Sequence, residues 1–187
     1  MSVGLGLSAA AGLRLFVPLL AMSAAALSGH LELTPTFDWI GTTEALIGFG
    51  VAAVLEIGAY LIPFLDNALD ALAGPAAAVA GTVLMASAVV DVDPFLQWTL
   101  AIVAGGGAAG TVQLFTSATR LGSTATTGGL ANPVVSTAEA GGSAGLSLVA
   151  IAVPLVAAVL AVALVYLALR TLSRVRWRGR FGRPPGA

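Results

Sequence analysis

Residues 143–169 read SAGLSLVAIAVPLVAAVLAVALVYLAL and contain no charged side chain. An α-helix needs about 20 mainly apolar residues to cross the hydrocarbon core of a bilayer. The stretch exceeds that length, so it predicts a membrane-spanning helix. Similar apolar stretches recur along the chain, and together they decide the fold class.

The composition of the whole chain leads to the same conclusion. Of its 187 residues, 58% are hydrophobic and 9% are charged, whereas a soluble domain carries about 25% charged residues. So few charges cannot cover a globular surface, and the remaining apolar surface must face lipid. We therefore expect an all-α, polytopic transmembrane helical bundle, with a single domain over residues 1–172 and a basic tail over residues 173–187.

We expect about five membrane segments. They cover approximately residues 4–28, 44–63, 68–90, 95–121 and 136–172. A glycine-rich run at 105–110 and a polar stretch at 122–142, which includes Gly141 and Gly142, predict broken or re-entrant half-helices. Non-helical backbone at membrane depth persists only where protein buries it or where it lines water. The same glycines also favour close packing between helices.

Arginines gather at the end of the chain. Six of the eight basic residues are Arg170, Arg174, Arg176, Arg178, Arg180 and Arg183. Basic segments that flank membrane helices stay on the cytoplasmic side, so we expect a cytoplasmic C-terminus in a bacterial cell membrane. Anionic lipid is the expected partner of this tail, a homo-oligomer is also considered, and no nucleic acid is expected. The side of the N-terminus stays open.

Several classes of chemistry are excluded by the residues present. The chain has no cysteine and a single histidine, His30, which excludes disulfides and clusters of cysteine or histidine around a metal. No nucleophile–base constellation or nucleotide-binding loop occurs. We therefore expect no cofactor, no metal and no enzymatic activity.

Two charged residues lie inside apolar segments, where a charge costs about 2.5–3.5 kcal/mol even on lenient scales. At about 1.5 Å per residue, Arg14 and Glu56 both lie about 20 Å from the loop between the first two segments. These helices are antiparallel, so an Arg14–Glu56 pair is predicted. It serves either a functional site or the register of two helices. Pro18 removes the helical hydrogen bond to the Arg14 carbonyl.

A second pair is predicted further along the chain. Arg120 ends the fourth segment, and Glu139 begins the last one. Glu139 also fits a capping box with Ser136, in which the two side chains satisfy the first amides of a helix. Both roles remain open for Glu139.

Other polar residues complete the candidate site. Gln113 and Asn132 lie beside the predicted breaks, and with Arg14, Glu56, Arg120 and Glu139 they form the predicted substrate or ion pathway. Asp66, Asn67 and Asp70 are secondary candidates, and helix capping or interfacial solvation is the simpler role for them.

Several stretches of the chain resemble a family of small bacterial and plastid integral membrane proteins, catalogued as a domain of unknown function. They are GLSAAAG at 6–12, Glu56 followed by IPFLDN at 62–67, and STATTGG at 123–129 followed by NPVVS at 132–136 and Glu139. The likeness spans approximately residues 4–169. It implies a membrane fold and little about chemistry.

Three functions compete at this point. The first is a small transporter or channel-like protein for a small solute, an ion or an anionic headgroup, because transporters place broken helices around a central site. The second is a non-transporting scaffold or partner-binding subunit, in which the charges hold helices together. The third is a membrane enzyme that acts on lipid. A transporter needs the polar residues in one hydrated cavity, whereas a scaffold needs them paired and dry.

Overall fold

The computed structural model describes residues 1–60, 62 and 65–181, with side chains described except at 65–68, 70–71 and 175–181. Every regular element in this part of the chain is a helix. The helices are α1 (Ser2–Ala11), α2 (Phe16–Leu27), the 3-10 helix η1 (Pro35–Gly41), α3 (Thr43–Ala59), α4 (Leu65–Ala88), α5 (Pro94–Leu100), the π-helix η2 (Ala101–Gly106), α6 (Gly107–Thr127), α7 (Asn132–Ala152) and α8 (Pro154–Phe181).

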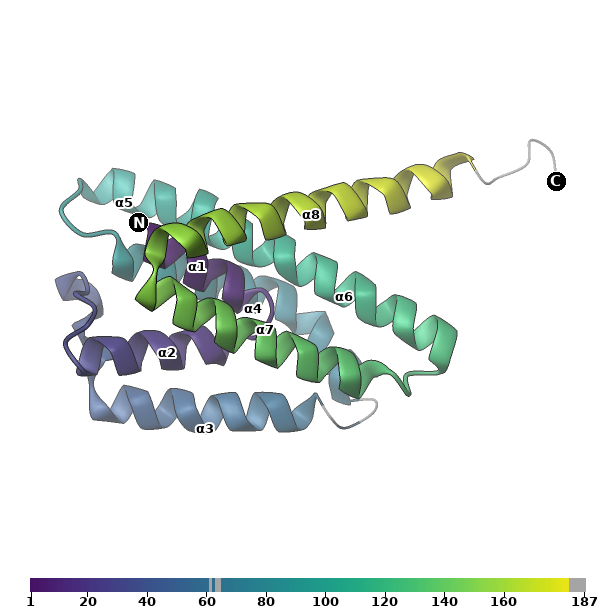
Figure 1. Ribbon diagram of the computed structural model, residues 1–187, viewed down its shortest axis with the longest axis horizontal. Coiled ribbons are helices and arrows are strands. Elements are labelled where there is room, and N and C mark those ends of the chain that lie inside the picture. Colours follow the sequence, from purple (N-terminus) through teal and green to yellow (C-terminus); the bar gives the residue numbers. More distant parts are fainter. Residues whose placement is uncertain (61, 63–64, 182–187) are drawn as a thin grey trace.

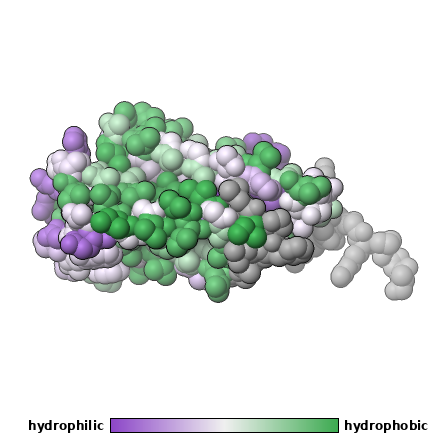
Figure 2. Space-filling model, turned by 90° about the horizontal axis from the view of Figure 1, so that it is seen from below, coloured by the Kyte–Doolittle hydropathy of each residue, from purple (hydrophilic) through white to green (hydrophobic). Residues whose placement is uncertain are grey.

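The chain is a multi-pass membrane protein. Three helical stretches are long and apolar enough to cross a bilayer, namely Pro94–Thr127, Asn132–Ala152 and Pro154–Arg174. A fourth results if η1 and α3, which are bent by 65°, count as one span. Figure 2 shows an apolar middle with hydrophilic residues toward the ends. The predicted all-α membrane bundle is confirmed.

The first apolar segment is a re-entrant pair and not the single span that was predicted. Helix α1 leads to a turn at residues 12–15, and α2 returns beside it (Figure 1). The N-terminus and the loop that follows α2 both contact the end of α4. The α-amino group of Met1 donates to the Ala88 carbonyl at 3.4 Å, and the Thr34 amide donates to the Ser87 carbonyl at 3.0 Å.

The length of the pair sets the depth of its turn. Helices α1 and α2 contain 10 and 12 residues, which correspond to about 15 and 18 Å. The hydrocarbon core is about 30 Å thick, so each helix is about half as long as a full span, and a turn at this distance from the membrane surface lies near the middle of the membrane. Helix α1 packs on α4, α7 and α8, and Leu7, Ala9 and Ala10 are fully buried. The turn is therefore enclosed by protein.

The predicted break at 105–110 is wrong, because the helix continues through it. The π-helix η2 joins α5 to α6 without interruption. The glycines serve close packing against α4 instead. A Cβ on Gly105 would lie 2.4 Å from the Gly81 carbonyl oxygen, and one on Gly106 would lie 2.6 Å from Thr82 Oγ1.

The broken or re-entrant half-helix predicted at 122–142 is wrong, because a short turn there joins two helices that are each long enough to span the membrane. Helix α6 ends in a turn where Gly128 and Gly129 have φ angles of +64° and +88°, a conformation that glycine adopts without strain. Helix α7 then begins at Asn132 and continues through Gly141 and Gly142. The break predicted at these two glycines is wrong.

The last predicted segment, residues 136–172, is two helices. The chain leaves the helical conformation at Val153, with φ −138° and ψ 73°, and α8 starts at Pro154. Proline disfavours the helical conformation of the residue before it and is well tolerated in the first turn of a helix. Pro154 therefore explains the break.

Candidate binding site

The turn of the re-entrant pair is held by a carboxylate from α3. Glu56 accepts hydrogen bonds from the Leu15 amide at 2.8 Å and the Phe16 amide at 3.0 Å. These amides belong to the start of α2, where backbone donors lack helical partners and the helix dipole favours negative charge. Glu56 thus satisfies a half-helix N-terminus near the middle of the membrane.

Arg14 reaches a different partner from the one predicted. Its Nη2 donates to the Ser136 carbonyl at 2.9 Å and also to Ser136 Oγ, and it lies 3.4 Å from Glu139 Oε2. Glu56 contacts the backbone next to Arg14, so the two residues lie at the same depth, as counting predicted. Their side chains do not pair, so the predicted ion pair is wrong. Glu56 binds the free amides of Leu15 and Phe16, while the Arg14 side chain extends to α7.

The predicted Arg120–Glu139 pair is confirmed. Arg120 Nε donates to Glu139 Oε1 at 3.2 Å, and Arg120 Nη2 donates to Glu139 Oε2. Glu139 lies inside α7, which starts at Asn132, so the alternative capping box with Ser136 is wrong. One carboxylate therefore contacts two guanidinium groups.

This charge cluster is almost completely enclosed. The exposed fraction is 1% for Arg14, 3% for Arg120 and 7% for Glu139. Ser143 also contacts the re-entrant pair, because its hydroxyl donates to the Ala10 carbonyl at the end of α1, at 3.0 Å. The cluster joins the tip of the re-entrant pair to α6 and α7.

Tyr60 is a member of the cluster that the sequence analysis missed. Its ring centroid lies 4.2 Å from Arg14 Cζ and 4.0 Å from Arg120 Cζ. A cation within about 6 Å of a ring face is attracted by it. A signal was present, because Tyr60 follows Glu56 by four residues and so lies on the same side of α3.

The cluster contains one buried donor that is not satisfied. Arg14 and Arg120 share Glu139, while the carboxylate of Glu56 accepts hydrogen bonds from two amides. Arg14 Nε is buried and has no hydrogen-bond partner among the described residues. An anionic or other hydrogen-bond-accepting group placed against this N–H would satisfy it.

A cavity of about 420 Å³ reaches the cluster from the side of α3 and α4. Among the described residues that line it, Glu56, Tyr60, Gln113 and Arg120 are polar, and the others are apolar. Gln113 is 7% exposed and donates from Nε2 to Ser117 Oγ at 3.2 Å. The volume lies within the range of ligand sites, about 300–1,000 Å³.

Asn132 is not among the residues that line this cavity. Asn132 is at the turn between α6 and α7, where its Nδ2 donates to Thr124 Oγ1 at 3.0 Å. The side chains of Asp66, Asn67 and Asp70 lie outside the described residues. Within the described part of the chain, no group of three or more histidine, cysteine, aspartate or glutamate residues could hold a metal ion.

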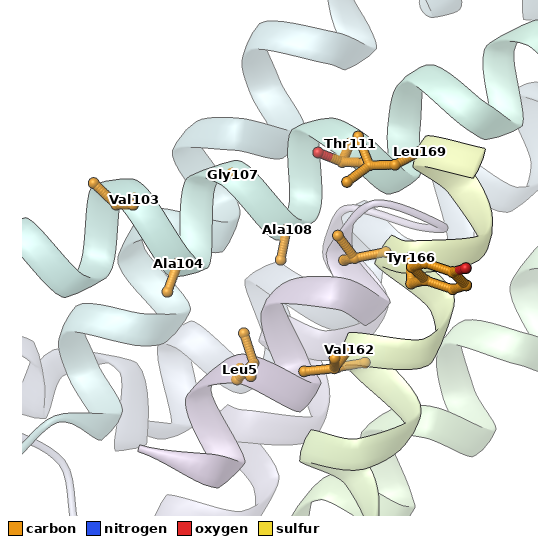
Figure 3. Close-up of a pocket in the computed structure, with 11 residues that line it drawn as sticks. Leu5, Val103, Ala104, Gly107, Ala108, Thr111, Val162, Tyr166 and Leu169 are labelled. Atoms are coloured by element: carbon orange, nitrogen blue, oxygen red, sulfur yellow. The ribbon is translucent and has the colours of Figure 1, made fainter. Parts of the chain in front are cut away.

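A second hollow contrasts with this cavity. It has a volume of about 490 Å³ and lies between α1, α6 and α8. Figure 3 shows Leu5, Ala104, Ala108 and Val162 around it, with Thr111 and Tyr166 as its polar members. Among the described residues that line it, none is charged.

Comparison with known proteins gives one match. A family described as Domain of unknown function (DUF4126) matches residues 1–174. No curated protein matches the chain, and no solved structure matches it either. The resemblance to a family catalogued as a domain of unknown function is confirmed.

Proposed function

Because the chain belongs to the DUF4126 family, whose description assigns no activity, we propose a function from the site itself. The protein is a small transporter or channel-like protein for an anionic solute or headgroup. Its substrate binds beside Arg120, in the cavity between α3, α4 and α6.

One observation carries this proposal: two enclosed guanidinium groups lie next to a cavity, and one of them, that of Arg14, has a buried Nε without a hydrogen-bond partner among the described residues. Buried charges inside a membrane are expensive, and those that line a path for substrate are a common reason for their presence. The site also lies at the tip of two half-helices. Half-helix termini near the membrane midplane bind charged substrates in many transporters.

The residues have distinct roles in this proposal. Arg120 lines the cavity and provides the charge that attracts the anion, while Arg14 stays behind it and supports Glu139. Glu139 balances the two arginines when no substrate is bound. Glu56 holds the turn of the re-entrant pair, and its own charge is offset by the α2 amides.

A second candidate function is a non-transporting scaffold. The observation in its favour is that Arg14, Arg120 and Glu139 are each less than a tenth exposed and bonded to one another. In a scaffold these bonds fix the positions of α6 and α7 against the re-entrant pair. Partners would then bind elsewhere on the bundle.

Cysteine accessibility separates the two functions, since the native chain has no cysteine. Single cysteines are placed at Ala73 and Gln113, which line the cavity. His30→Cys, at an exposed position, is the positive control, and Ala9→Cys, at a fully buried position, is the negative one. Modification of both cavity cysteines by water-soluble thiol reagents supports transport. Protection of both, equal to that of Ala9→Cys, supports the scaffold.

The orientation and location of the protein are part of the same proposal. In this proposal the C-terminus is cytoplasmic and the membrane is a bacterial cell membrane; the arginines beyond Leu169 support this orientation through the positive-inside rule. They also provide contacts for anionic lipid.

A further inference from the structure

We propose that ordered water along one face of α7 carries protons to Glu139, and that transport by this protein is therefore coupled to protons. Ser136, Ser143 and Ser147 lie on this face with Glu139, and we call it the serine face. The inference rests on the proposed function and names the ion that drives it.

Helix α7 is polar toward the protein and apolar elsewhere around its axis. Its buried residues recur at intervals of three or four, which places them on one side of the helix; they are Asn132, Ser136, Glu139, Ser143, Ser147 and Ala150. Val134 and Leu148 are 72% and 66% exposed. Serines at a helix–helix contact often serve close packing alone, so a role in binding water needs further evidence.

Ser147 provides that evidence, because its buried hydroxyl has no partner. The side chain is completely buried, and its Oγ forms no hydrogen bond to any described residue. A hydroxyl inside a helix can donate to a carbonyl of the preceding turn, as Thr82 does to the Ala78 carbonyl at 2.8 Å. Buried polar atoms that the protein leaves unsatisfied are the places where internal water binds.

Two more unsatisfied polar atoms lie on the elements that pack against α7. Ser23, on α2, is completely buried, and its Oγ also lacks a partner in the described part of the chain. The other atom is Arg14 Nε, in a side chain that binds the Ser136 carbonyl at 2.9 Å. At about 1.5 Å per residue from the level of Arg14, Ser23 lies about 12 Å along α2 and Ser147 about 16 Å along α7. The three atoms therefore lie at successive depths on neighbouring elements.

The serine face leads from the charge cluster to the end of the bundle that holds the N-terminus. Ser143 binds the Ala10 carbonyl, and a Cβ on Gly6 would lie 2.9 Å from the Ala150 side chain, so α7 runs antiparallel to α1. The spanning helix α8 begins at this end and continues to the opposite one (Figure 1). With the cytoplasmic C-terminus of the proposed function, the protons enter from outside the cell.

Glu139 is the acceptor at the inner end of this path. Among the described residues, the charged groups that contact it are Arg14, from the turn of the re-entrant pair, and Arg120, from α6. Glu56 and Tyr60 of α3 lie next to these arginines. Helices α1 and α2 carry no charged residue, and the arginines of α8 whose side chains are described are exposed.

The arrival of a proton couples to the binding of an anion. Water passes one proton to a carboxylate oxygen of Glu139, which becomes a neutral acid. Arg14 and Arg120 then lose the negative charge that they share, and a substrate anion beside Arg120 replaces it. One proton and one negative charge therefore enter the site together, and release of the proton reverses the step.

Radiolytic oxidation by X-rays tests for the water, because hydroxyl radicals form from bound water and oxidise the side chains beside it. The three methionines of the full chain form a matched set. Met22, next to Ser23, is completely buried, whereas Met85, which packs on Gly4 of α1, is 1% exposed and Met1 is 60% exposed. We expect Met22 to be oxidised severalfold faster than Met85, with Met1 as the exposed reference.

Two serine variants assign this oxidation to the serine face. Ser147→Ala removes the unsatisfied hydroxyl and should abolish the difference between Met22 and Met85. Ser8→Ala is the matched control, because Ser8 is also completely buried but donates to the Gly81 carbonyl at 2.8 Å. It should leave the oxidation of Met22 unchanged.

Infrared difference spectroscopy of the full chain tests for the proton. After a drop in pH, we expect a band of a protonated carboxylic acid that is missing from Glu139→Gln and appears severalfold more slowly in Ser147→Ala. If Glu139→Gln does not fold, the double variant Arg120→Gln/Glu139→Gln assigns the band in its place.

Oxidation of Met22 as slow as that of Met85 would overturn the inference, because the serine face is then dry. The absence of a Glu139 band would overturn it as well. The proposed function is tested separately by Ala73→Cys and Gln113→Cys. If these cysteines are modified while the serine face is dry, transport stands without proton coupling. If they are protected, transport fails and the coupling fails with it, whatever the oxidation of Met22.

Discussion

Arg14 Nη2 lies 3.4 Å from Glu139 Oε2, and this contact ties the tip of the re-entrant pair to the middle of the bundle. Arg120 binds the same carboxylate from α6. Both enclosed guanidinium groups therefore contact the same carboxylate. The following predictions test the parts of this arrangement one by one.

Removal of the shared carboxylate should destabilise the protein strongly. Glu139→Ala leaves two buried guanidinium groups without their common partner, and breaking a buried ion pair in this way costs about 3–5 kcal/mol. The measurement is thermal unfolding of the purified protein in detergent. Glu44→Ala, at an exposed position, should change the midpoint little. A Glu139→Ala variant as stable as this control would show that the cluster is not an essential ion-pair network.

A double variant separates charge compensation from packing. Combining Arg120→Gln with Glu139→Gln leaves Arg14 with a neutral amide acceptor and removes one of the two positive charges. We expect the double variant to be more stable than Glu139→Gln alone, because fewer buried charges are left without compensation. Additive effects of the two substitutions would show that the side chains act independently.

The ring of Tyr60 should stabilise the protein through the contact of its face with the two arginines. Tyr60→Phe keeps the ring between the two arginines, whereas Tyr60→Leu keeps only apolar volume. Interactions of a cation with a ring are worth about 0.5–2 kcal/mol, so the leucine variant should unfold at the lower temperature. Equal unfolding temperatures for the two variants would exclude a role for the ring face.

The carboxylate of Glu56 should protect the start of α2. Glu56→Ala removes the acceptor of the Leu15 and Phe16 amides, and loss of such a cap costs about 0.5–2 kcal/mol. Hydrogen exchange measured by mass spectrometry should become faster in the peptide that contains residues 12–18. Glu32→Ala, at an exposed position, is the control. Unchanged exchange in Glu56→Ala would mean that the turn does not depend on this cap.

Glycine packing between α4 and η2 should be intolerant of a methyl group. Gly105→Ala would place a Cβ 2.4 Å from the Gly81 carbonyl oxygen, and overpacking of this kind costs about 1–3 kcal/mol. Gly107→Ala is the matched control, since a Cβ there meets nothing within 4 Å. Lower thermal stability is expected only for Gly105→Ala. A similar response of both variants would contradict the close packing described for these helices.

The sequence was sufficient for the membrane class and for part of the site. Composition and apolar run length predict the helical bundle, and the positions of Arg120 and Glu139 near one turn predict their pair. Counting residues also places Arg14 and Glu56 at one depth. These predictions succeed because they depend on local spacing and on the cost of burying charge.

Other features depend on contacts that local spacing does not contain. A pair of half-helices and a single span have the same apolar composition, so residues 4–28 did not reveal the turn at 12–15. The run at 105–110 suggested a break, but Gly105 is required because the backbone of Gly81 on α4 leaves no room for a side chain there. Tyr60 was missed because the pattern of α3 does not show that two arginines from other helices converge on it.

The most direct test of the anion site compares two thiol reagents at Gln113→Cys, on the floor of the cavity. Sulfonatoethyl methanethiosulfonate is anionic, and trimethylammonioethyl methanethiosulfonate is cationic. We predict faster modification by the anionic reagent, relative to the rates at the exposed control His30→Cys, and loss of this preference when Arg120→Gln is added. A faster reaction with the cationic reagent, or no reaction with either, would contradict a water-accessible site that attracts anions.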